Sequence, residues 1–495
     1  MSAEPPGEIS ETIADADILA SREAGGQFLR GGGMRVLAYG LGLLVGLAST
    51  PLVTRHLGAT DWGHFVTVTS LIFIAVALTE GGVGNLGVRE FSTGDRDARR
   101  AFLSNLLGLR IVLSLIGAAG AVLFAVAAGY PRVLVEGTAI ACVSLLLEGL
   151  RATLAVPLTS QLRLGWLALS DFTAQFVTAT LMILLVVSGA SLLPFFTVAI
   201  VVALVTLSLT AVLVRHEVSL LPSFSLTQWR SLMSDSIVYA AATALGVVYF
   251  RIVAVAISLL AGRLQTGYFD LSFRILDIIN GLPWLLVASA FPILARAAHN
   301  DEERLRYALQ RLFDGSVVVG GLLSLCTITG APFAVEVVGG PSFHPSSSTL
   351  QILAVGITGT FLVATWSFAL LTLRLYRDLI VVNGLIVIIA VTLSVLLIPA
   401  YQAHGAAVVT ATLEVALAAG YGIVLSVRRP ELRPSLRGVP RVLLAFGIAL
   451  AISEALPVGA VAGTVIAACV MFAGLLALRA LPQEFLDALR RRTAG

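Results

Sequence analysis

The feature that most constrains this chain is its succession of long apolar runs. A helix that crosses the hydrocarbon core of a bilayer needs about 20 mostly apolar residues, and fourteen such runs lie between Gly33 and Ala480. With 57% hydrophobic and 12% charged residues, the composition excludes a soluble domain. The sequence therefore predicts an all-α polytopic membrane protein with about fourteen transmembrane helices. Their predicted limits are 34–54, 64–88, 106–129, 133–158, 166–188, 193–215, 233–259, 266–294, 315–338, 349–373, 379–399, 404–427, 440–456 and 459–480.

The arginines predict how these helices are threaded through the membrane. All 32 basic residues are Arg, and cytoplasmic loops of membrane proteins collect positive charge. If the N-terminus is cytoplasmic, 25 arginines fall on the inner side and only Arg55, Arg132 and Arg263 on the outer side, while four lie within spans. A missed helix would invert every later loop, so this distribution predicts an even number of spans with both termini in the cytoplasm.

The chain ends, cysteines and loops narrow the class further. Residues 1–30 form an acidic stretch without the apolar core of a signal peptide, and we interpret them as a disordered cytoplasmic tail. Three cysteines within apolar spans favour packing roles over disulfides. The six histidines show no spacing typical of metal ligands. Short outer loops and the absence of lysine argue against a catalytic domain, a Walker A nucleotide site and Schiff-base chemistry. We therefore expect no enzyme activity, no cofactor, no metal and no nucleic-acid partner.

A short motif occurs twice. The pattern G-x4-G-x-F at Gly58, Gly63 and Phe65 returns 204 residues later at Gly262, Gly267 and Phe269, both times on a predicted outer loop between two spans. Six helices separate the copies, and an even number preserves orientation. This predicts two parallel six-helix repeats, a frequent plan for transporters. The predicted division is a tail at 1–30, lobes at 31–220 and 221–427, two additional helices at 428–480 and a basic cytoplasmic tail at 481–495.

Three ordered stretches carry a family resemblance. They are "RHLGATDWGHF" at 55–65, "GYFDLSFRILDIINGLPWLLVASAFPILAR" at 267–296 and "LLIPAYQAHGAAVVTATLE" at 396–414. Together they resemble the polysaccharide-export flippases of the Wzx type, which belong to the MOP superfamily with the multidrug extruders and the lipid II flippases. Two positions depart from the family pattern. Glu80 stands where the family often has Asp, and Arg251 replaces an Asp common in the seventh helix, which places the family's ion-coupling role for that Asp in doubt.

The resemblance implies a function and partners. It implies two six-helix lobes around a central cavity, which move a polyprenyl-pyrophosphate oligosaccharide from the inner to the outer leaflet of a bacterial cytoplasmic membrane for cell-surface polysaccharide assembly. Its implied partners are this lipid-linked oligosaccharide, membrane lipids, and the polysaccharide polymerase and chain-length machinery. The alternatives are a cation-coupled multidrug or small-molecule antiporter of the same fold and a lipid II-type flippase. A membrane-embedded glycan-processing enzyme fits less well, because no outer loop carries a convergent catalytic set.

Four arginines within the spans are the candidate substrate-binding residues: Arg251, Arg274, Arg151 and Arg110. Charged groups at membrane depth are costly unless they are paired or functional, and the guanidinium group donates two parallel hydrogen bonds to a phosphate. Two structural alternatives compete. Arg151 has Glu148 three residues earlier on its helix, and Asp270 and Asp277 lie on the helix face of Arg274. Arg110 is close enough to a helix end, as predicted, to reach the interface by snorkelling.

Acidic side chains within the spans are the candidate ion-coupling residues. We single out Asp277, Glu414, Glu148 and Glu80. Each is explained equally well or better by an arginine partner or a helix cap, most clearly Glu148. We expect coupling to a proton or sodium gradient, with neither ion selected. Residues 299–313 are amphipathic, and we expect a helix that lies on the cytoplasmic surface.

The arginine distribution gives a testable topology. Single cysteines placed in both tails and in the 89–100 loop of a variant without native cysteines should be protected from a membrane-impermeant thiol reagent in intact cells. They should react after the membrane is opened. Labelling of the loop at Arg96 from outside would refute the assignment.

Overall fold

The computed structural model describes residues 22–80, 84, 87–88, 91, 96–161, 163–215, 221–226, 228–230, 249, 251–300, 302–478 and 480. For residues 22–48, 96–98, 164 and 284–300 only the backbone is described. The predicted tail at 481–495, and most of the predicted acidic tail, lie outside the described residues.

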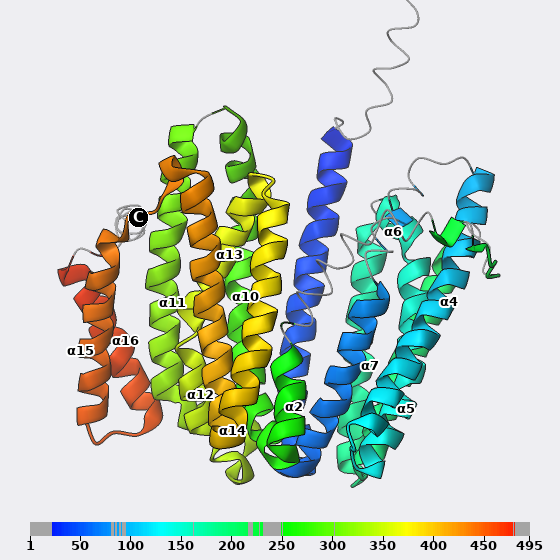
Figure 1. Cartoon of the computed structure of the whole chain (residues 1–495), viewed down its shortest axis with the longest axis horizontal. Coiled ribbons are helices and arrows are strands. Elements are labelled where there is room, and N and C mark those ends of the chain that lie inside the picture. Colours follow the sequence, from blue (N-terminus) through cyan, green and yellow to red (C-terminus); the bar gives the residue numbers. More distant parts are fainter. Residues whose placement is uncertain are drawn as a thin grey trace, which may run out of the picture. The chain divides into compact units, whose positions relative to one another are not determined.

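Helices make up the described part of the chain, which contains no strand (Figure 1). The main helices are α2 (Arg22–Glu80), α4 (Arg96–Ala127), α5 (Arg132–Leu154), α6 (Val156–Ser160), α7 (Leu164–Val187), α8 (Leu192–Val214), α10 (Gly262–Asn300), α11 (Glu302–Gly339), α12 (Ser346–Ala354), α13 (Ile357–Thr372), α14 (Tyr376–Arg428), α15 (Val439–Ala455) and α16 (Ala460–Ala477). A shorter apolar helix spans Arg251–Leu260. The all-α prediction is confirmed.

Many of these helices are suited to a membrane. Among the described residues, nine helices are long and apolar enough to cross it, or ten if the bent pair α12 and α13 forms one span. Residues 233–248 of the predicted seventh span lie outside the described part. The count of fourteen therefore stays a prediction.

Two long helices contain a break where the sequence predicts a turn between spans. In α2, Gly58 adopts φ 69° and ψ 174°, which interrupts the helix between the first two predicted spans. In α14, Gln402 adopts φ 52° and ψ −126°, at the predicted connection between the runs 379–399 and 404–427. The predicted span 349–373 is divided instead into α12 and α13, which meet at an angle of 41°.

The chain forms two compact units. Unit 1 comprises Met1–Thr50, Leu78–Leu123 and Ala139–Ala240, and unit 2 comprises Pro51–Ala77, Phe124–Thr138 and Ala241–Gly495. Segments from the first half of the sequence thus pack with the second half inside unit 2. The predicted lobe boundary at residue 220 remains a prediction.

Unit 1 has its own core on α4. Leu103, Leu106 and Leu107 pack with Leu154 and Val156. The connector after α8 also lies on α4 within this unit, because the Trp229 indole N–H donates to the carbonyl oxygen of Asn105 at 3.1 Å.

The repeated motif forms a reciprocal backbone crossing in unit 2. A Cβ atom on Gly63 would lie 1.9 Å from the carbonyl oxygen of Arg263, and one on Gly267 would lie 1.9 Å from the carbonyl oxygen of Ala59. The first glycine of each copy has a positive φ, 69° at Gly58 and 80° at Gly262, a region that favours glycine. The motif therefore recurs because each copy provides both a turn and a bare surface for the other copy.

A second contact within unit 2 closes the C-terminal end of α11. The Arg55 Nη2 donates to the carbonyl oxygens of Glu336 and Val337, both at 2.8 Å. The Thr54 hydroxyl donates to the carbonyl oxygen of Val338 at 2.6 Å. These bonds satisfy acceptors that the end of a helix leaves without an internal partner.

The predicted surface helix at 299–313 is wrong in one respect. Residues 302–313 form the first turns of α11, which continues without interruption to Gly339. Their amphipathic pattern is real, but the apolar face packs on protein: Leu305, Leu309 and Phe313 are buried, and the Phe313 ring stacks on Trp366. The pattern alone could not distinguish a membrane surface from a protein surface.

The two additional C-terminal helices pack on α11. Figure 1 shows α15 and α16 beside each other at one edge of unit 2, and both contact α11. Their inner faces bury Val442, Ala445, Ala467 and Met471. The Thr329 hydroxyl of α11 donates to the Thr464 hydroxyl of α16 at 3.1 Å.

The glycine crossing predicts a specific steric defect. Gly63→Ala or Gly267→Ala places a methyl group on a carbonyl oxygen, so the two helices must separate, at a cost of about 1–3 kcal/mol or more. We expect a lower thermal unfolding midpoint and less monodisperse protein in detergent. Gly120→Ala on α4 is the matched control, because nothing lies within 4 Å of its added Cβ. An unchanged midpoint for both crossing variants would contradict the crossing.

Candidate functional site

Two arginines of unit 2 lie over aromatic rings of α2. The guanidinium carbon of Arg251 is 4.8 Å from the centroid of Phe73, and that of Arg274 is 5.4 Å from the centroid of Trp62. A ring face attracts a cation but accepts no hydrogen bond in the plane of the guanidinium group. With respect to these two rings, the N–H edges of both arginines stay available to other partners.

The acidic residues near these arginines do not form direct ion pairs with them. Within the described part of the chain, no carboxylate oxygen lies within 4.0 Å of a side-chain nitrogen of Arg251 or Arg274. The charges of both arginines nevertheless act on Asp270 and Asp277. Asp270 is 4% exposed, whereas Arg274 on the same helix is exposed. Two arginines and two aspartates therefore lie in this region of unit 2, and no described contact pairs an arginine directly with an aspartate.

Glu414 in α14 is held by neutral groups. The Tyr249 hydroxyl donates to its Oε1 at 2.8 Å, and the Thr360 hydroxyl of α13 donates to its Oε2 at 3.0 Å. The residue is 7% exposed, and it has no ion-pair partner among the described residues. The structural alternative of an arginine partner thus receives no support in the described part. A buried carboxyl group without a cation is costly in its charged form, so this group is suited to holding a proton or a small cation.

Arg151 and Glu148 of unit 1 form the predicted pair. The Arg151 Nε donates to Oε1 and Oε2 of Glu148 at 3.0 and 2.8 Å, and Nη2 also contacts Oε1. The i,i+3 spacing on α5 brings the two side chains to one face. Both carboxylate oxygens are occupied by one arginine, which favours the structural interpretation of these two residues.

Arg110 does not reach a membrane interface, and the snorkelling expectation is wrong. Arg110 is only 2% exposed, and its Nη1 donates to the carbonyl oxygen of Thr79 at 2.9 Å. The helix α4 begins at Arg96, earlier than the predicted limit of 106, so Arg110 lies well inside it. Thr79 is in the last turn of α2, where free carbonyl groups and the helix dipole favour a cation.

Glu80 lies at the edge of this contact. Its Oε1 is 3.9 Å from the Arg110 Nη2, and its side chain is 49% exposed. That distance exceeds a hydrogen bond. The predicted residues thus fall into two groups. Arg251, Arg274, Asp277 and Glu414 belong to unit 2, and Arg110, Arg151, Glu148 and Glu80 belong to unit 1.

Sequence reasoning missed the neutral partners of these charges. The rings of Phe73 and Trp62 contact the two arginines of unit 2. The hydroxyl groups of Tyr249 and Thr360 donate hydrogen bonds to Glu414. Trp62 lies inside the repeated motif, which could have indicated it. No spacing connects Tyr249 or Thr360 with Glu414, because they come from different helices. Groups of metal-ligating side chains were not found among the described residues, and the three cysteines are free.

Comparison with known protein families shows to which family this chain belongs. Residues 28–298 match the family of polysaccharide biosynthesis proteins, which covers more than half of the chain. The chain belongs to this family. The predicted resemblance is thereby confirmed. The search of curated proteins finds no match by sequence.

Solved structures with the same fold are transporters of the MOP superfamily. The chain is similar to the lipid II flippase MurJ in an inward closed conformation, with a TM-score of 0.73, 14% identity and coverage of 90% of this chain and 98% of the other. It is also similar to an inward-facing multidrug resistance MATE family transporter, with a TM-score of 0.62, 13% identity and coverage of 79% and 95%. A MOP superfamily transporter from Pyrococcus furiosus matches with a TM-score of 0.53, 14% identity and coverage of 83% and 96%.

These matches establish the fold and the coarse class. The family and the apolar helices make this chain a multi-pass membrane protein, with the fold shared by flippases and multidrug transporters. At 13–14% identity, the similarity to those proteins does not identify the substrate of this one.

Proposed function

We propose that this protein is a flippase that moves a polyprenyl-pyrophosphate-linked oligosaccharide from the inner to the outer leaflet of the bacterial cytoplasmic membrane by alternating access. The polysaccharide biosynthesis family supports the cargo class. In this proposal both termini are cytoplasmic, the cargo is destined for surface polysaccharide assembly, and the polymerase and chain-length machinery act on it after release.

The arrangement of Arg251 and Arg274 is the observation that carries the proposal. Both guanidinium groups lie on aromatic rings, and neither is within ion-pairing distance of a described carboxylate. A cation at membrane depth that no described carboxylate contacts directly is costly unless it has a function. A pyrophosphate supplies the charge and the paired oxygen acceptors that such arginines lack. The same chemistry serves a lipid II-type cargo, which shares the pyrophosphate, whereas a cationic drug would be repelled.

Substitution of these arginines tests the cargo site. Loss of one charged hydrogen-bonding partner costs about 2–3 kcal/mol, or roughly 30 to 150 fold in binding at about 1.4 kcal/mol per decade. We expect Arg251→Ala and Arg274→Ala to abolish flipping of a polyprenyl-pyrophosphate oligosaccharide in proteoliposomes. Arg→Lys at either site should give partial activity, because lysine keeps the charge and loses the paired donors.

Two controls separate binding from folding. The double variant Glu148→Gln/Arg151→Gln removes both members of a partly exposed ion pair together and should flip at near the wild-type rate. A triple variant with Asp270→Asn, Arg274→Gln and Asp277→Asn should fold and remain inactive. Transport by this triple variant at the wild-type rate would remove Arg274 from the site. Efflux of a cationic dye with no flipping of lipid-linked cargo would instead identify an antiporter.

We propose further that Glu414 couples transport to a proton or sodium gradient, with Asp277 as the second candidate. Glu414 is buried, its two oxygens accept from hydroxyl groups, and none of the described residues supplies a cation to it. A carboxyl group in this setting can exchange a proton or hold a sodium ion with additional oxygen ligands. Glu148 is less suited because Arg151 occupies both of its oxygens, and Glu80 because its side chain is about half exposed.

Replacement of Glu414 by a neutral isostere tests this coupling. The Gln side chain in Glu414→Gln still accepts a hydrogen bond from one hydroxyl, so the fold should persist. We expect the wild-type flipping rate in proteoliposomes to rise with an imposed proton or sodium gradient, and the Glu414→Gln rate to be independent of both. Tyr249→Phe, which removes one hydrogen bond, should weaken the response without abolishing it. A gradient response of Glu414→Gln equal to wild type would exclude this residue.

A further inference from the structure

A cavity lies where α13 ends and α14 begins. Its volume is about 370 Å³, and it is lined by Arg374, Leu375, Tyr376, Arg377, Asp378 and Arg428. All of its lining residues belong to unit 2. None of them is among the proposed cargo-binding or ion-coupling residues. By the predicted topology it opens on the cytoplasmic side of the membrane.

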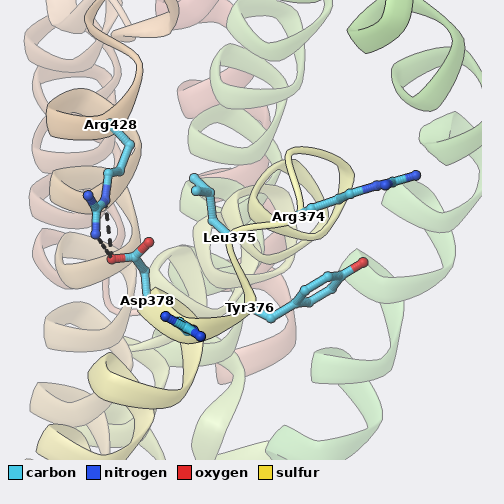
Figure 2. A pocket seen from close by; sticks show the side chains of 6 residues that line it. Arg374, Leu375, Tyr376, Asp378 and Arg428 are labelled. Carbon is cyan, nitrogen blue, oxygen red and sulfur yellow. Dashed lines mark hydrogen bonds and ion pairs between the residues drawn. The ribbon is translucent and has the colours of Figure 1, made fainter.

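The charges around this cavity are not balanced. Asp378 accepts from Arg428 Nη2 at 2.8 Å and from Nε at 3.3 Å, as Figure 2 shows. That pair joins the first turn of α14 to its last turn, so it has a structural role within the hairpin. Arg374 and Arg377 are exposed and have no ion-pair partner among the described residues. Two positive charges therefore remain at the cavity.

Arg374 occupies a position where glycine would be unstrained. Its φ is 57°, in the left-handed region. The Leu375 N–H donates to the carbonyl oxygen of Leu370, and the Arg374 N–H donates to that of Leu371, which together form a Schellman motif at the end of α13. Glycine is the usual residue at this position of the motif. An arginine here indicates that its side chain has a role outside the turn.

An apolar stripe follows the cavity along α14. Val381, Leu385 and Ile388 are exposed by 69%, 56% and 65%, and they follow Arg377 at intervals of four, four and three residues. Residues at this spacing lie on one face of a helix. Tyr376 is 52% exposed at the start of the stripe, as expected for an aromatic residue at the boundary between hydrocarbon and head groups. In Figure 2, Arg374 and Tyr376 extend to the same side, away from the Arg428–Asp378 pair.

We propose that this cavity binds the phosphodiester head group of an anionic phospholipid of the inner leaflet. Arg374 and Arg377 donate charge-assisted hydrogen bonds to the phosphate oxygens, and an acyl chain lies along Val381, Leu385 and Ile388. Basic pockets next to membrane helices on the cytoplasmic side attract anionic lipids by the same forces. The apolar stripe below the cations selects a lipid over a free phosphate ion. This binding is independent of the transported cargo.

Lipid-dependent stability of the purified full-length chain tests the site. We expect the thermal unfolding midpoint in detergent to rise with added phosphatidylglycerol, and much less with phosphatidylcholine or inorganic phosphate. The variant Arg374→Gly/Arg377→Gln should need at least about tenfold more phosphatidylglycerol for the same rise, since the loss of charged hydrogen bonds is worth at least about one decade in affinity. Arg374→Gly relieves the left-handed strain, so the fold should not suffer.

The matched control is Arg437→Gln, an exposed arginine on the same predicted side and outside the cavity. It should respond to phosphatidylglycerol as the wild type does. A response of the double variant equal to wild type would refute the site. Equal stabilisation by inorganic phosphate would show that the site holds an anion without its lipid chain, which also overturns the proposal.

As a second measurement, Val381→Trp places a fluorophore on the stripe. Its quenching by brominated phosphatidylglycerol should exceed that by brominated phosphatidylcholine, and the excess should disappear in the Arg374→Gly/Arg377→Gln background. Equal quenching by the two lipids in the Val381→Trp protein would contradict the proposal. This result does not depend on the thermal unfolding measurement.

Discussion

Hydrocarbon supplies no hydrogen-bond partners, and this constraint governs where the chain can bend and where it can carry charge. Backbone groups in lipid must be satisfied within the protein, so the chain consists of long helices whose breaks are confined to a few positions. The break at Gly58 in α2 is followed five residues later by the crossing at Gly63. There the backbones approach so closely that no side chain fits between them. The carbonyl groups at the end of α11 are closed by Thr54 and Arg55 of the same helix α2.

The same constraint sorts the charges within the helices into three kinds. Arg151 is neutralised by Glu148 on its own helix, and Arg110 is held by the end of α2, so both have a structural explanation. Arg251 and Arg274 lie on aromatic rings, and no described carboxylate pairs with either of them. Among the described residues, the partners of the Glu414 carboxylate are two hydroxyl groups. The last two kinds have no direct ion-pair partner in the described part of the chain, and they are the groups to which the proposed cargo and coupling ion are assigned.

The cavity at Arg374 extends this reasoning to the membrane boundary. Arg428 and Asp378 satisfy each other, whereas Arg374 and Arg377 do not have such partners in the described chain. A positively charged cavity next to an exposed apolar stripe meets the conditions under which a phospholipid head group is held at one place. Such a lipid would bind along α14 of unit 2, while the cargo is handled by different residues. The protein would then recognise phosphate in two settings, one for transport and one for its place in the bilayer.

By itself the sequence determined the all-α membrane class, the family, the repeated glycine motif and the Glu148–Arg151 pair. These depend on composition, on local spacing and on resemblance, all of which can be counted along the chain. Only the tertiary structure decided that the two glycine motifs cross, that Arg110 is buried instead of reaching the interface, and that residues 302–313 pack on protein. It also decided that Tyr249 and Thr360 hold Glu414. These contacts join helices far apart in sequence, and their geometry arises from how the helices pack, which no local pattern specifies.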